Sequence, residues 1–397
     1  MNRVKWRSMR VGFACAAALT STLALTGSSL AATHASSHAA KSAKDLKIYY
    51  IDVEGGASTL YVTPQGHTLL IDTGWPAGMG GPKLGPNDPQ PKPTPSSAQR
   101  IAAQLKTLGL KKIDYLLMSH YHIDHLGGAL ELMKLEPIGT FIDHGPNREM
   151  PRPNATPQQL ANSTQANYEK YLAAIADKPH IVMAPGQTLK IDDLSLTAVN
   201  ADGKVIDHPL DPSAGPGAQC DKATSNDNTG GEENVRSVGV VMTWGRARVM
   251  ALADTVWNVE NRLVCPTNLI GKIDLMLIDN HGTSNANSPT LLNSVAPSVV
   301  VFDNGPTKGA DGAVLHEINN SPSVRGVWQL HFATRSPEDN TAPDHIVNVL
   351  GDDPIDPLII DVNKSGTVTV VNPRNGYSQS YKQADKGPAA NEPSSTH

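Results

Sequence analysis

Four side chains that can bind a metal ion lie within residues 120–125, which read His-Tyr-His-Ile-Asp-His. Imidazole nitrogens and carboxylate oxygens are ligands that suit zinc, iron and manganese. On a tight turn, the alternate positions His120 and His122 would bind one ion, and Asp124 and His125 would bind a second. The sequence therefore predicts a metal centre with one or two ions, with zinc expected and manganese or iron as alternatives.

Predicted elements on either side would position this run. Residues 113–118 form an apolar segment that predicts a buried strand, and residues 126–135 predict a helix. Short apolar segments bounded by turn residues predict further strands, the first three of which suggest an antiparallel meander. The expected strands are 47–53, 58–62, 67–72, 138–142, 188–191, 194–199, 235–244, 247–252, 273–278, 299–302, 327–332, 358–362 and 367–371. The expected helices include one capped at Ser96 or Ser97, one at 163–176 and one starting at Ser288.

The order of these elements indicates the architecture. Strands and then strand–helix units occur twice along the chain, which favours two sheets packed face to face with helices outside, a four-layer αββα sandwich of the α/β class. One such unit, residues 46–381, is expected between a flexible lead-in at 33–45 and a disordered tail at 382–397. A long Gly/Pro segment at 75–95 is predicted to be a flap over a site.

The run at 120–125, directly after an apolar strand, resembles the metal-binding motif of the metallo-β-lactamase superfamily. Residues 72–74 (Asp-Thr-Gly) resemble the first motif of that superfamily, and their spacing to the run fits. The resemblance extends over about residues 46–371 and implies an αββα fold, a mono- or binuclear metal site and hydrolysis of esters, thioesters, lactams, lactones or phosphodiesters. Residues 51–57 and 279–282 are most similar to a branch that includes exported hydrolases and the nuclease-like domain of DNA-uptake competence proteins.

The resemblance implies the remaining ligands position by position. Asp254 ends a strand where the family's bridging Asp would be, although Ala253 stands where Gly is usual. His281 precedes Gly282 as the family's last His does, although Asn280 stands where this branch usually has His. The two departures leave open a binding protein with an impaired metal site.

The third histidine of the first ion is not evident. The family would place it roughly between 190 and 215, where His208 is a candidate ligand, although a solvated loop residue is the favoured interpretation. The branch instead has an Asn/Ser segment, which residues 233–237 of this chain resemble. Asn234 is therefore expected near the metals.

The resemblance also implies roles around the metals. Asp124 would bind the second ion and orient or deprotonate a metal-bound water to give the attacking hydroxide, and Asp72 would fix the ring of a ligating histidine through its other nitrogen. His144 and His331 would either line the site or be buried and hydrogen-bonded. The predicted function is an exported metal-dependent hydrolase of ester, lactam, lactone or similar bonds. A manganese- or zinc-dependent nuclease or phosphodiesterase is the alternative.

The N-terminus predicts export. Basic residues in 1–10, an apolar segment at 11–25 and small residues at 29–32 form the pattern of a signal peptide, residues 1–32. Its cleavage would take the formal charge from −5 to about −9, which disfavours nucleic acid as a partner. Residues 309–312, in place of the His-Pro-His segment of the competence nucleases, disfavour it too. We expect a small-molecule substrate, a periplasmic or secreted location and no membrane contact after cleavage.

Two cysteines remain once Cys15 leaves with the signal peptide. Cys220 and Cys265 form an even pair in a chain expected in an oxidising compartment, which predicts a disulfide. Metal binding is the alternative, but neither residue has a Cys or His at ligand spacing.

Overall fold

The computed structural model describes residues 44–80, 94–213, 215–349 and 356–382 of the 397-residue chain. The predicted signal peptide, nearly all of the lead-in, most of the predicted flap and residues 383–397 of the predicted tail lie outside the described residues. No helix among the described residues is long and apolar enough to cross a membrane.

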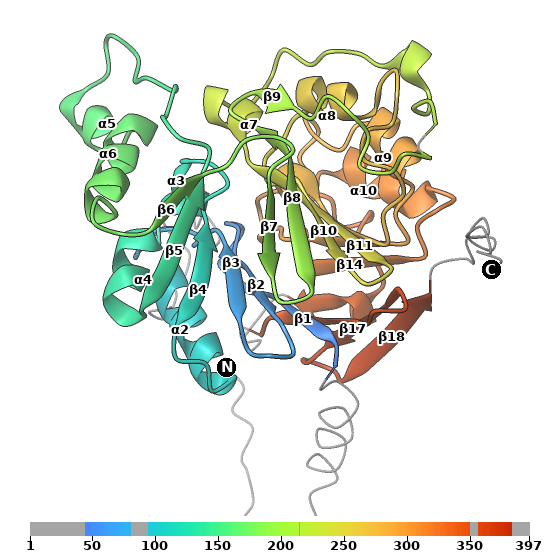
Figure 1. The fold of residues 1–397 in the computed structure, drawn as a ribbon, viewed down its shortest axis with the longest axis horizontal. Coiled ribbons are helices and arrows are strands. Elements are labelled where there is room, and N and C mark those ends of the chain that lie inside the picture. Colours follow the sequence, from blue (N-terminus) through green and yellow to red (C-terminus); the bar gives the residue numbers. More distant parts are fainter. Residues whose placement is uncertain (1–43, 81–93, 214, 350–355, 383–397) are drawn as a thin grey trace, which may run out of the picture. The chain divides into compact units, whose positions relative to one another are not determined.

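The first sheet consists of β1 (Leu46–Tyr50), β2 (Thr59–Val62), β3 (Thr68–Ile71), β4 (Ile113–Leu117), β5 (Ile138–Asp143), β6 (His180–Val182), β16 (Leu358–Val362), β17 (Thr367–Asn372) and β18 (Tyr377–Lys382). Their order is β18-β17-β16-β1-β2-β3-β4-β5-β6 (Figure 1). The predicted antiparallel meander of β1, β2 and β3 is confirmed, and β3 to β6 run parallel.

The second sheet consists of β7 (Thr188–Ile191), β8 (Leu194–Ala201), β9 (Lys204–Val205), β10 (Gly239–Trp244), β11 (Ala247–Ala251), β12 (Leu275–Leu277), β13 (Val299–Phe302), β14 (Gly326–His331) and β15 (Ile346–Asn348). Their order is β15-β14-β13-β12-β11-β10-β8-β7, and β9 pairs with β8. Strands β11 to β15 run parallel, and β12 and β13 are apolar and buried along their whole length, as expected for strands covered on both faces.

The described α-helices are α2 (Ser97–Thr107), α3 (Ile123–Leu126), α4 (Ala129–Leu135), α5 (Pro157–Ala161), α6 (Thr164–Ala174), α7 (Glu232–Arg236), α8 (Trp257–Val264), α9 (Pro289–Val295) and α10 (Gly312–Asn320). Short 3₁₀ turns are η1 (Cys220–Lys222), η2 (Asp279–Gly282) and η3 (Pro343–His345). The predicted cap of α2 is confirmed, because Ser96 Oγ accepts from Gln99 N while the Gln99 side chain accepts from Ser96 N.

Three buried apolar clusters define the layers. The cluster between the sheets includes Ile48 of β1, Val249 of β11 and Trp328 of β14. A second cluster packs α2, α4 and α6 against the first sheet, and a third packs α8, α9 and α10 against the second sheet. Figure 1 shows these two sets of helices on opposite sides of the paired sheets. The predicted four-layer αββα sandwich is confirmed.

Two predicted elements are wrong in detail. The strand predicted at 235–244 begins only at Gly239, because the preceding residues form α7, where the Glu233 side chain is fully buried. The helix predicted at 126–135 is interrupted between α3 and α4. Gly127 and Gly128 lie there, and a Cβ on Gly128 would be 2.2 Å from Thr73 O. In both places a tertiary contact, rather than the local sequence pattern, determines the backbone conformation.

Candidate metal centre

The metal-capable side chains meet where strands of both sheets end. The turn after β4, the turn after β11 and η2 after β12 lie together at this point. At this point, atoms that could ligate an ion lie within 4.8 Å of one another in two groups, and the described residues contain a third such group, Asp52, Glu54 and His331, outside these two. The four-residue group is Asp124, His125, Asp254 and His281, and the three-residue group is His120, His122 and Asp254. The structure thus brings together all six ligands expected from the sequence, with Asp254 in both groups.

Short distances join the four-residue group. His125 Nε2 lies 3.3 Å from His281 Nε2 and 3.1 Å from Asp254 Oδ1. His281 Nε2 lies 3.3 Å from Asp124 Oδ2. The group therefore directs two ring nitrogens and two carboxylate oxygens toward one point, a donor set that suits a divalent cation.

In the three-residue group, His120 has an unpaired ring nitrogen. Its side chain is fully buried, and Nε2 has no hydrogen-bond partner, the nearest carboxylate oxygen being Asp254 Oδ2 at 3.9 Å. Burial, together with the nearby charge of His125, holds the pKa of His120 well below its usual value of 6.5. The ring is therefore neutral and keeps a lone pair for a ligand.

The histidines of the four-residue group have the opposite tendency. Burial and the Lys308 ammonium lower the pKa of His281, but the surrounding carboxylates outweigh them and raise it to about 9. Burial likewise opposes the charged form of His125, yet Asp254, Asp124 and other carboxylates raise its pKa well above the usual value. The carboxylates thus favour positive charge here, and a cation would compete with these protons.

Asp72 lies behind His125. Its Oδ2 is 2.7 Å from His125 Nδ1, and its carboxylate also accepts from the backbone N and the hydroxyl of Ser119. With Nδ1 held by Asp72, the His125 ring directs Nε2 toward the centre. This is the position that the sequence analysis expected for Asp72.

The two departures from the family motif lie at left-handed backbone positions. Ala253 has φ +55°, a conformation that glycine adopts without strain and alanine adopts at a cost of about 1 kcal/mol. Asn280 has φ +46°, and asparagine is enriched in this region. Asp254 and His281 nevertheless reach the cluster, so neither departure removes its neighbouring side chain from the site.

Asn234 and Asn280 line the cavity at the centre, which has a volume of about 360 Å³ and is also lined by His122, Asp124 and Asp254. Asn234 is buried and donates to Thr229 O, while its Oδ1 has no hydrogen-bond partner. Asn280 Nδ2 donates to Asn285 Oδ1. Both asparagines thus lie beside the cluster, outside the two groups of candidate ligands.

The three other histidines considered from the sequence lie outside the two groups at the centre, and His331 belongs to the separate group with Asp52 and Glu54. His144 is buried and its Nε2 lies 2.9 Å from Glu233 Oε2. His208 is exposed and bonded to Asp207. His331 Nε2 lies 2.8 Å from Asp52 Oδ1, in a buried network with Arg100. The structure thus gives His144 and His331 the buried, hydrogen-bonded role that was the alternative for each.

Three residues near the centre were missed in the sequence. Glu149 lies 3.1 Å from His122 Nε2, and Asp303 Oδ2 lies 3.3 Å from His281 Nδ1. Lys308 forms an ion pair with Asp124. Only Asp303 has a local signal, because it directly follows parallel strand β13, beside β12.

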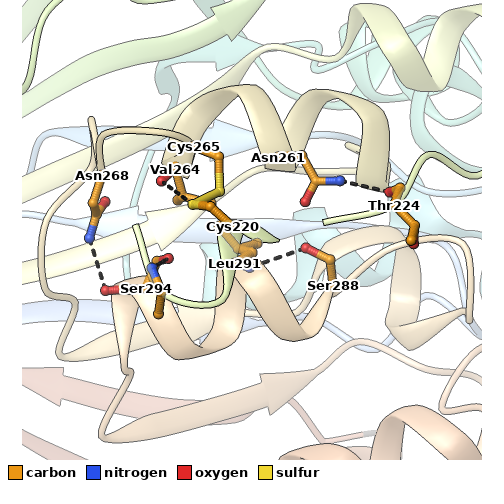
Figure 2. The surroundings of a disulfide bond; sticks show 10 residues. Cys220, Thr224, Asn261, Val264, Cys265, Asn268, Ser288, Leu291 and Ser294 are labelled. Carbon is orange, nitrogen blue, oxygen red and sulfur yellow. Dashed lines mark hydrogen bonds between the residues drawn. A yellow bond between two sulfur atoms is a disulfide. The ribbon is translucent and has the colours of Figure 1, made fainter. Parts of the chain in front are cut away.

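The predicted disulfide between Cys220 and Cys265 is present, with Cα atoms 5.6 Å apart (Figure 2). It joins η1 to the end of α8, beside a hydrogen bond from Asn261 to Thr224 O. The two sulfur atoms are therefore not metal ligands.

Comparisons with known proteins give a family match and remote structural matches. Igni18, a metallo hydrolase from Ignicoccus hospitalis, is 16% identical over 71% of this chain and 94% of its own, with a TM-score of 0.38. A possible metal-dependent hydrolase from Veillonella parvula is 11% identical over 71% of this chain and 96% of its own, with a TM-score of 0.39.

A metallo-beta-lactamase mutant from Cronobacter sakazakii is 18% identical over 52% of this chain, with a TM-score of 0.29, and the chain spans 60% of that protein's length. No curated protein matches the sequence. The likeness to the competence branch stays a prediction, because none of these matches tests it.

The family match begins after β1, includes the His-rich run and ends after β9. Residues 51–217 match the sequence model of the metallo-beta-lactamase superfamily. This part of the chain, which contains the His-rich run, is thus similar to the metallo-beta-lactamase superfamily, and the two facing sheets agree with that likeness.

Proposed function

We propose that this protein is a metal-dependent hydrolase whose centre binds one or two divalent cations, with zinc the first candidate and manganese or iron the alternatives. The observation that carries this proposal is His120 Nε2, a fully buried nitrogen without a hydrogen-bond partner beside the Asp254 carboxylate. Leaving such an atom unpaired is costly unless a ligand completes it. His120, His122, Asp124, His125, Asp254 and His281 are the proposed ligands, and their donor atoms fit these cations.

The chain's own residues would orient the histidine rings and accept a proton. Bound cations in such a centre lower the pKa of a water molecule toward neutrality and polarise the oxygen of the scissile bond. Asp72 would hold the ring of His125 and Glu149 would hold that of His122, through the contacts described above. The Asp124 carboxylate would accept the proton released during attack, because Asp124 lines the cavity of the centre.

The cavities support a small molecule as substrate. The cavity of about 360 Å³ at the centre shares Asn228 and Gly230 with a neighbouring cavity of about 800 Å³. These sizes are typical of sites for small molecules. We propose an ester, lactam, lactone or similar bond as the target and no nucleic-acid partner, since the formal charge of the chain is −5.

We also propose that the protein is exported to the periplasm or secreted, with a disulfide formed after export. The Cys220–Cys265 bond supports this location, because such bonds form and persist in oxidising compartments. A fusion of residues 1–45 to a reporter active only outside the cytoplasm tests it. A silent reporter would contradict export.

Metal analysis of the purified protein tests the centre. We expect about one or more equivalents of metal per chain, a loss of at least about half in His120→Ala, and no change in His208→Ala, the matched control. A wild-type content below about half an equivalent, unchanged in His120→Ala, would contradict a metal centre.

Assays with a chromogenic ester, a cephalosporin, a lactone and bis(p-nitrophenyl) phosphate then test which type of bond the protein hydrolyses. We expect turnover of a carbonyl substrate that EDTA and His120→Ala abolish. Turnover of the phosphodiester alone would favour the nuclease or phosphodiesterase alternative.

A further inference from the structure

Lys308 places a fixed positive charge inside the candidate metal centre. Its Nζ forms an ion pair with Asp124 Oδ2 and lies 5.0 Å from the centroid of the Trp75 ring. The side chain of Asp124 is only 11% exposed, and that of Lys308 is 33% exposed. The pair therefore lies largely out of solvent, where charges are weakly screened.

The surrounding backbone holds Lys308 in this position. Gly305 N donates to Lys308 O at 2.9 Å, which closes the turn that follows β13. Gly305 packs directly on Gly55, where an added Cβ would lie 2.9 Å from Gly305 N. Trp75 Nε1 in turn donates to Glu54 O. Lys308 is thus a packed residue rather than a freely moving surface lysine.

The two groups of candidate ligands differ in their relation to this charge. Asp124 belongs to the four-residue group with His125, Asp254 and His281, and Lys308 already binds one of its two carboxylate oxygens. A dication in that group would have to share Asp124 with an ammonium ion and would be repelled by it. Within the part of the chain that the structure describes, no residue of the three-residue group of His120, His122 and Asp254 is paired with a lysine or arginine.

We propose that Lys308 takes the place of a second metal ion: it weakens cation binding in the four-residue group and supplies the second positive charge of the centre. The centre would then hold one cation tightly and a second one weakly. This inference rests on the proposed function, because it presupposes a metal centre. It adds a residue from outside the motif that sets how many ions the centre holds.

Zinc titration of the metal-free protein, followed by calorimetry and by dialysis with elemental analysis, tests the inference. We expect wild type to bind one zinc ion tightly and a second at least about tenfold more weakly. Lys308→Met, which removes the charge and keeps most of the side-chain volume, should tighten the second step at least about tenfold. Lys308→Arg, which keeps the charge, should behave as wild type.

Arg335→Met is the matched control. Arg335 lines the same cavity, but its ion-pair partner is Asp311, at 4.0 Å, rather than a candidate ligand. We expect the affinity of Arg335→Met for the second zinc ion to differ from that of wild type by less than about twofold. Two equally tight zinc ions in wild type, with no change in Lys308→Met, would overturn the role of Lys308 alone. Absence of zinc binding in wild type and in Lys308→Met would instead overturn the proposed metal centre.

Discussion

The Cys220–Cys265 disulfide closes the loop that contains one of the central candidate ligands. Strands β10 and β11, Asp254 and helix α8 all lie between the two cysteines. Removing the bond leaves the folded contacts of this loop in place but frees the loop in the unfolded chain. The double variant Cys220→Ser/Cys265→Ser should therefore lose stability mainly through the unfolded state.

The loop length sets the size of this loss. The cysteines are 45 residues apart, and closing a loop of this length removes about 13 cal/mol/K of unfolded-state entropy, or about 4 kcal/mol at 25 °C. At roughly 2 cal/mol/K of unfolding entropy per residue, a unit of roughly 330 residues has an unfolding entropy of about 0.7 kcal/mol/K. The expected decrease in Tm is therefore about 5–6 °C.

Urea denaturation and differential scanning calorimetry of wild type, the two single variants and the double variant provide the assay. Each single variant breaks the same bond, so all three variants should lose similar stability. A reductant should destabilise wild type by a similar amount and leave the double variant unchanged. A loss below about 1 kcal/mol in the double variant would refute the loop-closure reasoning.

Two further changes probe the site and the inter-sheet network. Gly231 has φ +149° and an added Cβ would lie 2.8 Å from the His122 ring, whereas Gly186 has φ +87° and open space. Gly231→Ala should therefore cost about 3 kcal/mol in urea denaturation and Gly186→Ala about 1 kcal/mol, and equal losses would argue against the contact.

Burial opposes the charged form of His331, but Asp52 outweighs it and raises the pKa of His331. The stabilisation of the folded state by protonated His331 is therefore full below pH 6.5 and is lost as the pH rises through the raised pKa. The pKa of Asp52 is lowered despite burial, chiefly by His331. The stabilisation by ionised Asp52 is therefore present above pH 3.8 and is lost as the pH falls through the lowered pKa. His331→Gln should cost about 2 kcal/mol at pH about 5.5 and less at pH about 9 in urea denaturation; a pH-independent cost would contradict the ion pair.

The sequence predicts the fold wherever local patterns and tertiary contacts agree. Strands β12 and β13 are continuous apolar runs that are buried on both faces, so the pattern alone locates them. Residues 232–236 differ, because Glu233 accepts hydrogen bonds from Tyr121 N and Arg148 N and contacts His144. These partners are distant in the sequence, so no local pattern predicts the helix that they favour.

The candidate site divides in the same way. The candidate ligands in the run at 120–125 lie close together in the sequence, so their spacing alone indicates a shared centre. Glu149 and Lys308 lie on separate loops, and each meets the centre only through folding, by contacts that span 27 and 184 residues. Spacing predicts which residues could bind an ion, but the charges that surround the ion come from tertiary structure.

The departures from the family motif are explained by conformation rather than by residue type. At position 253 the turn requires a left-handed backbone, and alanine adopts it at a cost of about 1 kcal/mol while leaving Asp254 in the cluster. At position 280 asparagine adopts the same region, and its side chain is engaged by Asn285. His281 therefore needs the turn that precedes it, not a second histidine. A Gly substituted at position 253 should relieve this strain and stabilise the protein by about 1 kcal/mol without changing its metal content.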